Sequence, residues 1–220
     1  MNKKNTIIAV AALVVAAGAA AFAFTQNNKS SDMGGMNHGS QTTDNTDSAT
    51  YKQLAALKGE DYDRMFLADM MAHHQGAIDM ANLALTQAKH PELKTMAQDI
   101  ISAQNKEITD MKAWQTSWGY PATSGNNMMD HSAMGMENDM AATTNQLKSL
   151  NGDAFDKKFL ELMIEHHQSA IDMARPAASN AQHAEVKTLA KAVVDAQSKE
   201  IDQMQSWQTD WGYKSVPTSH

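Results

Sequence analysis

Apolar residues recur at three- and four-residue steps along two long stretches of the chain, which is the spacing of a helix face. The first stretch runs from about Asp61 to Ala88, with its apolar face at Phe66, Met70, His73, Ala77, Met80 and Ala84. The second runs from about Glu92 to Trp118, with its face at Leu93, Met96, Ala97, Ile100, Ile101, Ile108, Met111, Trp114 and Trp118. No segment alternates as a strand would, so the pattern predicts an all-α protein.

Residues at the ends of these stretches predict where the two helices start and stop. Asp61 and Asp63 favour the start of the first helix, by capping and by the helix dipole. His90-Pro91 predicts the turn, because proline restrains the residue before it and suits the first helical position. Gly119 predicts the end of the second helix. The two helices therefore form a hairpin.

The hairpin pattern occurs twice in the chain. Residues 49–120 align with residues 142–213 at a constant offset of 93, and 37 of the 72 aligned residues are identical. Self-similarity of this kind identifies a duplication. Two amphipathic hairpins can bury their apolar faces against each other, so we predict a four-helix bundle made of two repeats. The alternative is that each hairpin pairs with another molecule.

The second repeat departs from the first at Pro176, which stands where the first repeat has Leu83. A proline inside a helix removes one N–H donor and crowds the preceding turn. We therefore expect a kink or an early end in that helix.

Segments outside the repeats lack helical periodicity. Lys3 and Lys4 precede an apolar run over residues 7–24, which is the layout of a secretory signal but is also long enough for a single membrane anchor. We therefore predict export to the periplasm or another extracytoplasmic compartment, with residues 1–28 as a cleaved signal or an anchor. Residues 29–48 and 121–141 are polar and Gly-rich, which predicts flexible linkers, and residues 214–220 form a tail.

Composition narrows the chemistry. The chain has no cysteine, which excludes disulfides and thiolate metal sites. It has 17 methionines and 9 histidines, so a soft metal would be bound by thioether and imidazole groups. The net charge of −7 argues against nucleic acid or an anionic membrane surface as a partner and suits a protein that attracts cations. Membrane contact is expected only through an uncleaved N-terminal segment.

Each repeat carries an adjacent histidine pair between two methionines. Helical geometry places these four residues over one sector of the first helix, and a Gln, a Glu and a Met share a stripe on the second. Thioethers select soft ions such as Cu(I). The predicted metal ligands are Met70, His73, His74, Met80, Glu107 and Met111 in the first repeat, and Met163, His166, His167, Met173, Glu200 and Met204 in the second. Each histidine pair could bind one ion or face two.

These residues also have structural explanations. Methionine at helical spacing usually fills a core. A hydrogen bond to histidine would explain Glu107 and Glu200 without a metal. Asp79 and Asp172 point away from the histidine pairs in angle, so we interpret them as structural.

Aromatic and histidine residues near the turns are a separate group. His90 and His183 lie at the turns between helices and are predicted to be solvated, with a ligand at the rim of the bundle as the alternative. The tryptophan pairs are interpreted as packing between the repeats, with a cation–π contact to an ion as the alternative. They are Trp114, Trp118, Trp207 and Trp211.

Methionine and histidine also gather in the predicted linkers, where there is no core for them to fill. Capture of a soft metal by a flexible segment would account for them. These weaker candidates are Met33, Met36, His38, Met128, Met129, His131, Met134, Met136 and Met140.

The motif of each repeat resembles the hallmark of the bacterial family known as domain of unknown function 305. That hallmark resembles Met-x-x-His-His-x-x-Ala-Ile-x-Met-Ala on one helix, followed by Gln-x-x-Glu-Ile-x-x-Met on the next. The matching residues are Met70, His73, His74, Ala77, Ile78, Met80, Ala81, Gln104, Glu107, Ile108 and Met111, with Met163, His166, His167, Ala170, Ile171, Met173, Ala174, Gln197, Glu200, Ile201 and Met204 in the second repeat. The resemblance implies a ferritin-like four-helix bundle, usually exported, with members that bind copper and support copper tolerance.

Three functions are consistent with these observations. The first is a non-enzymatic exported protein that sequesters or relays Cu(I), with Ag(I) as a second ion and other copper-handling proteins as candidate partners. The second is a di-iron oxidase, although such sites need about four carboxylates and the matching stripes offer Glu107 and Glu200. The third is a structural or interaction bundle without metal. No phosphate loop or zinc-protease motif supports hydrolytic catalysis.

Overall fold

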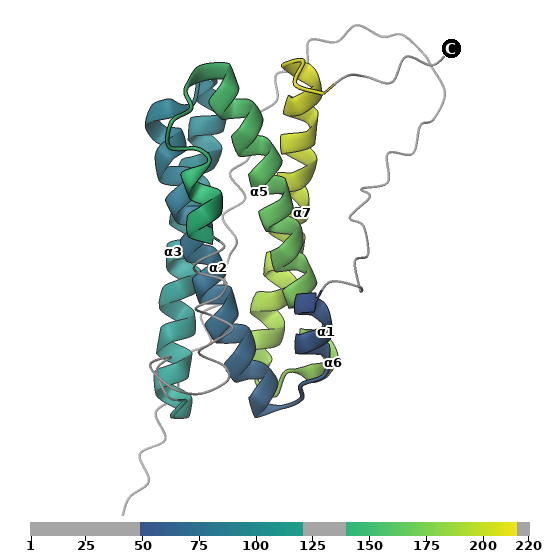
Figure 1. Ribbon diagram of the computed structural model, residues 1–220. Helices are drawn as coiled ribbons and strands as arrows, with labels where there is room; N and C mark the ends of the chain where they lie inside the picture. The colour runs from purple at the N-terminus through teal and green to yellow at the C-terminus, as the bar shows by residue number, and fades with distance from the viewer. Residues whose placement is uncertain (1–48, 121–139, 215–220) are drawn as a thin grey trace, which may run out of the picture. The chain divides into compact units, whose positions relative to one another are not determined.

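The computed structural model describes residues 49–120 and 140–214, and within these ranges the protein is helical with no strand (Figure 1). Four long helices carry most of it: α2 (Glu60–Gln87), α3 (Pro91–Trp118), α5 (Gly152–Ala174) and α7 (Ala184–Asp210). The all-α prediction is confirmed. The predicted signal or anchor, the first linker and most of the second linker and the tail lie outside the described residues.

The first hairpin follows the predicted boundaries closely. Pro91 is the first residue of α3, and Gly119 caps its end in the left-handed conformation, with φ 71°. The expected capping role of the aspartates is wrong, because the N-cap of α2 is Gly59 and no side chain bonds there. Asp63 is instead fully buried and bonds to the second repeat.

Each repeat also begins with a short helix that the sequence pattern did not predict. In the first repeat it is α1 (Ala49–Ala55), and in the second it covers residues 140–145, so the predicted linker ends before residue 140. The aligned residues Leu54 and Leu147 are both fully buried. A single leucine is too little periodicity to predict a helix, but its burial fixes each segment against the bundle.

Pro176 ends the first helix of the second repeat early, as predicted. Helix α5 stops at Ala174, whereas the aligned α2 continues to Gln87. A four-residue helix, α6 (Ala177–Asn180), follows the proline.

The two hairpins pack through their first helices. Helix α2 contacts α3, α5 contacts α7, and α2 also contacts α5 (Figure 1). The α2–α5 pair is antiparallel, because the Tyr62 hydroxyl donates to the carbonyl of Met173 while His73 contacts His166. The predicted bundle of two repeats is therefore formed within one chain.

Each repeat holds the inter-helix turn of the other through a buried aspartate. Asp63 accepts hydrogen bonds from the backbone N–H of Gln182 and His183, and its Oδ2 lies 2.7 Å from Nδ1 of His183. Asp156 bonds in the same way to Lys89 and His90, with 2.6 Å to Nδ1 of His90. We call these two groups the turn clasps.

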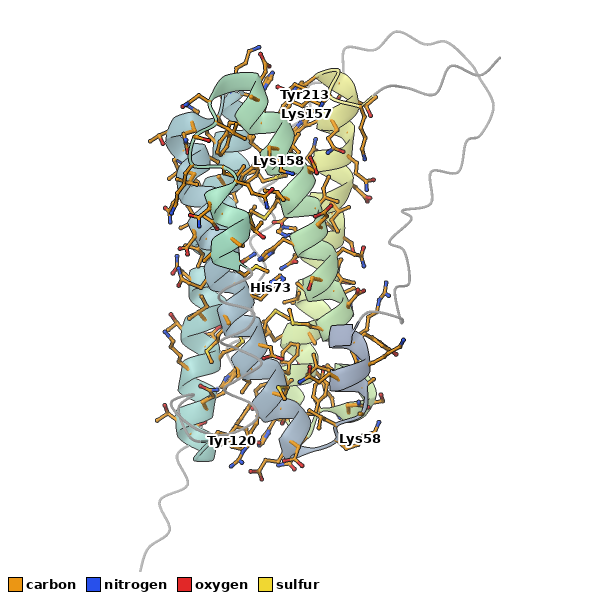
Figure 2. The ribbon with its side chains drawn as sticks, viewed as in Figure 1. Lys58, His73, Tyr120, Lys157, Lys158 and Tyr213 are labelled. Atoms are coloured by element: carbon orange, nitrogen blue, oxygen red, sulfur yellow. The ribbon has the colours of Figure 1, made fainter. Side chains whose placement is uncertain are left out.

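Aromatic rings complete the turn clasps. Trp118 stacks on His183 at 3.7 Å between ring centroids, and Trp211 stacks on His90 at 3.8 Å. The interpretation of these tryptophans as packing between repeats is confirmed. The prediction of solvated turn histidines is wrong, because a partner aspartate and a stacked indole leave 22 % of the His90 side chain and 24 % of that of His183 exposed. Tyr120 and Tyr213, which contact these histidines edge-on, lie at opposite ends of the bundle (Figure 2).

Within residues 49–120 and 140–214, no helix combines the length and the apolar character needed to cross a membrane.

Candidate metal centre

The two histidine pairs meet in one buried layer where α2 crosses α5. The rings of His73 and His166 are 3.6 Å apart between centroids and tilted by 39°. All four side chains are buried, with His166 the most exposed at 4 %. Figure 2 shows His73 near mid-length of the bundle. The periodicity predicted an inward face for each pair, and the packing of α2 on α5 unites the pairs into a single histidine layer.

A glutamate on the neighbouring helix orients the second histidine of each pair. We call these residues, His74 and His167, the outer histidines, and His73 and His166 the inner histidines. Nε2 of His74 lies 2.6 Å from Oε2 of Glu107, and Nε2 of His167 lies 2.6 Å from Oε2 of Glu200. A carboxylate accepts the hydrogen bond, so Nε2 carries the proton and the lone pair of a neutral ring is at Nδ1. In both residues Nδ1 is buried without a hydrogen-bond partner. The two glutamates thus fix which nitrogen is free to bind a ligand.

The inner histidines, His73 and His166, contact each other across the two repeats. Nε2 of His166 donates to the backbone carbonyl of His73 at 3.0 Å, which leaves the lone pair of His166 at Nδ1. Both ring nitrogens of His73 lack a hydrogen-bond partner, as does Nδ1 of His166. A buried polar group without a partner costs about 1–3 kcal/mol, so such a group in a native core requires an explanation.

Burial keeps the inner imidazoles neutral. The pKa of His73 is well below its usual value, because burial disfavours the charged ring and because His166, His74 and His167 would repel it. The pKa of His166 is also well below its usual value, from burial first and then from repulsion by His167 and His74. A neutral ring offers its lone pair to a metal without competition from a proton.

The predicted methionine ligands are all buried, but the two on α2 lie in different parts of the core, as do the two on α5. Met70, Met111 and Met173 belong to one core cluster, and Met80, Met163 and Met204 to the other. Each repeat contributes two of its methionines to one cluster and the third to the other. Because α2 and α5 are antiparallel, each cluster mixes thioethers from both repeats.

The remaining predicted residues occupy several environments. Asp79 is exposed and bonded to Gln75, whereas Asp172 is buried beside Arg175. Met140 is half-buried. The other linker candidates, from Met33 to Met136, lie outside the described residues.

Two glutamines on the helices of Glu107 and Glu200 are buried polar residues that we did not predict as ligands. Gln104 and Gln197 are 4 % and 3 % exposed, and the side-chain oxygen of each has no hydrogen-bond partner. Their position three residues before Glu107 and Glu200 places them on the same helix stripe. Their identity in both repeats is the signal that could have identified them.

The donor set suits a soft ion of low coordination number. Among the described residues, no group of three or more His, Cys, Asp or Glu side chains is arranged to hold a metal. Cu(I) and Ag(I) favour imidazole and thioether donors, whereas hard divalent ions prefer oxygen ligands. The buried imidazole lone pairs and the buried methionines on the same helices are donors of the kind that soft ions prefer.

Comparison with solved structures gives close matches in fold. CopM in its Cu(I)-bound form is 37 % identical, with a TM-score of 0.55, and the match covers 68 % of this chain and 96 % of CopM. CopM has also been solved with Ag and with Cu(II). A DUF305 protein from Streptomyces coelicolor is 29 % identical, with a TM-score of 0.61, over 72 % of this chain and 97 % of its own.

Relatives found by sequence are consistent with these matches. A 51-residue stretch is 37 % identical to the uncharacterized protein L153 of Acanthamoeba polyphaga mimivirus, and it covers 23 % of this chain and 34 % of that protein's length. The sequence pattern of the family described as domain of unknown function (DUF305) matches residues 12–82 and 63–208, which is most of the chain. The chain therefore belongs to the DUF305 family, as the histidine–methionine motif of its two repeats predicted.

Proposed function

We propose that this protein is an exported, non-enzymatic copper-binding protein that sequesters or relays Cu(I), with Ag(I) as a second ion. The observation that carries the proposal is the histidine layer, in which ring nitrogens of four buried histidines have no hydrogen-bond partner. The solved CopM structures with copper and silver support it, because CopM is 37 % identical over 96 % of its length.

Histidines, glutamates and methionines of the chain would each have a different role in binding the copper ion. His73 and His166 supply neutral imidazole donors at the crossing of α2 and α5. Glu107 and Glu200 hold the outer rings so that Nδ1 is free. Thioethers in the adjoining core clusters raise the preference for a soft ion.

Export is part of the proposal and is supported by the N-terminal sequence. Lys3 and Lys4 precede the apolar run of residues 7–24, as in a secretory signal. Outside the cytoplasm, thiols oxidise to disulfides, so a chain without cysteine that binds a soft ion through Met and His suits that environment. Other copper-handling proteins are the partners that a relay would need.

The histidine layer favours copper over the di-iron alternative. A ferritin-type di-iron site uses about four carboxylates with two histidines in the bundle core. Glu107 and Glu200 are the carboxylates bonded to the layer, and each is already paired with a histidine. Thioethers are poor ligands for iron in such a site.

Titration of Cu(I) into the mature protein against a competing chelator tests the proposal. Replacing His73, His74, His166 and His167 together by Gln should weaken binding more than 100-fold, since changing a residue that only supports a ligand already costs about 10–100-fold. The double variant His90→Gln with His183→Gln is the control, because it removes histidines outside the layer. Circular dichroism checks that each variant folds.

One result would count against the site. Unchanged affinity in a folded quadruple variant would exclude the histidine layer as the binding site. The single variant His73→Gln adds a milder test, and it should still weaken binding if the quadruple variant does not fold.

A further inference from the structure

The stripe of donor residues on α2 has a gap at Gly76. His73 lies three residues before it and Met80 four residues after it, so the three positions share one face of the helix. A glycine within a helix costs about 1 kcal/mol relative to alanine. The second repeat has Ser169 at the aligned position, so the helix itself does not require a glycine there.

The side chain of Met140 occupies the space that a Gly76 side chain would need. A Cβ built on Gly76 would lie 2.7 Å from Cγ of Met140 and 2.9 Å from its Sδ. Real Cβ atoms essentially never approach other atoms this closely, so glycine is what admits the thioether to the helix. Met140 comes from the helical segment 140–145, which opens the second repeat, and thus fills the gap on α2 of the first repeat.

Met140 differs from the neighbouring donors in its exposure. His73 is fully buried and Met80 is 1 % exposed, whereas Met140 is half-buried. Cβ atoms three or four residues apart on a helix are about 5–6 Å from each other, so the Met140 side chain packs on α2 at the position between His73 and Met80. It is therefore a partly exposed thioether beside a stripe of buried donors.

We propose that Met140 is the uptake ligand of the histidine layer, a thioether that accepts Cu(I) or Ag(I) at the surface and passes it to His73. The ion moves by ligand exchange: a bond from copper to a nitrogen of His73 forms as the bond to the Met140 sulfur breaks, and copper stays Cu(I). This inference rests on the proposed function, because it presumes that the layer binds the ion.

Transfer kinetics on the full mature chain test the inference. A coloured Cu(I)–chelator complex is mixed with protein, and its loss of absorbance gives the rate of uptake. Met140→Leu, which conserves volume, should slow uptake about tenfold, while the equilibrium affinity stays within about twofold. Gly76→Ala should also slow uptake, because its Cβ would push the sulfur away.

Met71→Leu is the matched control. Met71 is also half-buried on α2, but it lies two residues from His73 and so faces a different direction. Uptake by this variant should match that of the unmodified chain. Thermal unfolding of all three variants confirms that they are folded before their rates are compared.

Several outcomes would overturn the role of Met140. One is a rate of copper uptake by Met140→Leu equal to that of the unmodified chain. Another is uptake by Met71→Leu that is slowed as much as uptake by Met140→Leu. A loss of affinity as large as the loss of rate would make Met140 a permanent ligand instead. Failure of the proposed function is distinguishable, because the unmodified chain itself would then take no copper from the chelator.

Discussion

At the scale of single residues, the histidine layer combines burial with missing hydrogen bonds. His73 is fully buried, and neither of its ring nitrogens has a partner. Nε2 of His166 donates to the backbone carbonyl of His73, so the two inner histidines are joined where α2 crosses α5. The duplication therefore yields one layer to which both repeats contribute a buried imidazole.

The pKa of the inner histidines gives a pH dependence of stability. Both values are below the ordinary 6.5 in the folded protein, so the unfolded chain binds more protons in acid. The stability contributed by these neutral rings is complete above about pH 6.5 and is lost as the pH falls below it. We expect the free energy of unfolding to drop by as much as about 1.4 kcal/mol per pH unit for each ring.

Denaturant unfolding between pH 7 and pH 4.5 measures this effect. The double variant His73→Gln with His166→Gln should have a shallower dependence over that range. A dependence as steep as that of the unmodified chain would show that other groups cause it.

At the scale of elements, the turn clasps explain how the two hairpins hold each other. The aspartate of one repeat bonds the turn of the other, and a tryptophan from the aspartate's own repeat stacks on the turn histidine. Asp63 and Asp156 are fully buried, so their carboxyl oxygens need hydrogen-bond partners within the protein. Removing one partner of a buried charged pair leaves the other without compensation. This lowers the free energy of unfolding more than replacing both partners with apolar residues does.

Replacing either buried aspartate tests the turn clasps. Asp63→Asn and Asp156→Asn should each lower the free energy of unfolding by about 3 kcal/mol, because the amide cannot accept all the bonds that the carboxylate does. The effects should add in the double variant, since the two groups lie at opposite ends of the bundle. Asp79→Asn is the control, because Asp79 is exposed, and a loss as large as that of Asp63→Asn would contradict this account.

At the scale of the whole molecule, the described residues form one unit in which neither repeat is complete alone. Without the other hairpin, each hairpin would expose its apolar face to solvent. It would also lose the aspartate that bonds to its inter-helix turn. Calorimetry should therefore show a single unfolding transition. Two separate transitions would mean that the repeats fold independently.

Silver should stabilise this unit if the histidine layer binds it. Free Ag(I) at 100 times its dissociation constant should add about 2.7 kcal/mol to the free energy of unfolding and raise the Tm accordingly. The variant with Gln at His73, His74, His166 and His167 should not show this rise in Tm. The variant with Gln at His90 and His183 should still show it. A rise that persists without the layer would place the silver elsewhere.

The duplication, the four long helices and the inward face of the histidine pairs could be predicted from the amino-acid sequence alone. These features are local, because helical periodicity records which side of a helix is apolar and where the helix ends. Glu107 and Glu200 were predicted as metal ligands, with a hydrogen bond to histidine as the alternative, and the structure shows that hydrogen bond because a hairpin brings the inner stripes of its two helices together.

The residues that meet across helices could be known only from the folded protein. The antiparallel crossing of α2 and α5 placed Met173 in the cluster of Met70 and Met163 in the cluster of Met80, and it joined the two histidine pairs into one layer. The sequence predicted Asp63 as a helix cap, but its side chain bonds to His183 in the inter-helix turn of the other repeat. Contacts of this kind depend on how whole helices pack, and residue spacing along one helix carries no record of the partner it will face.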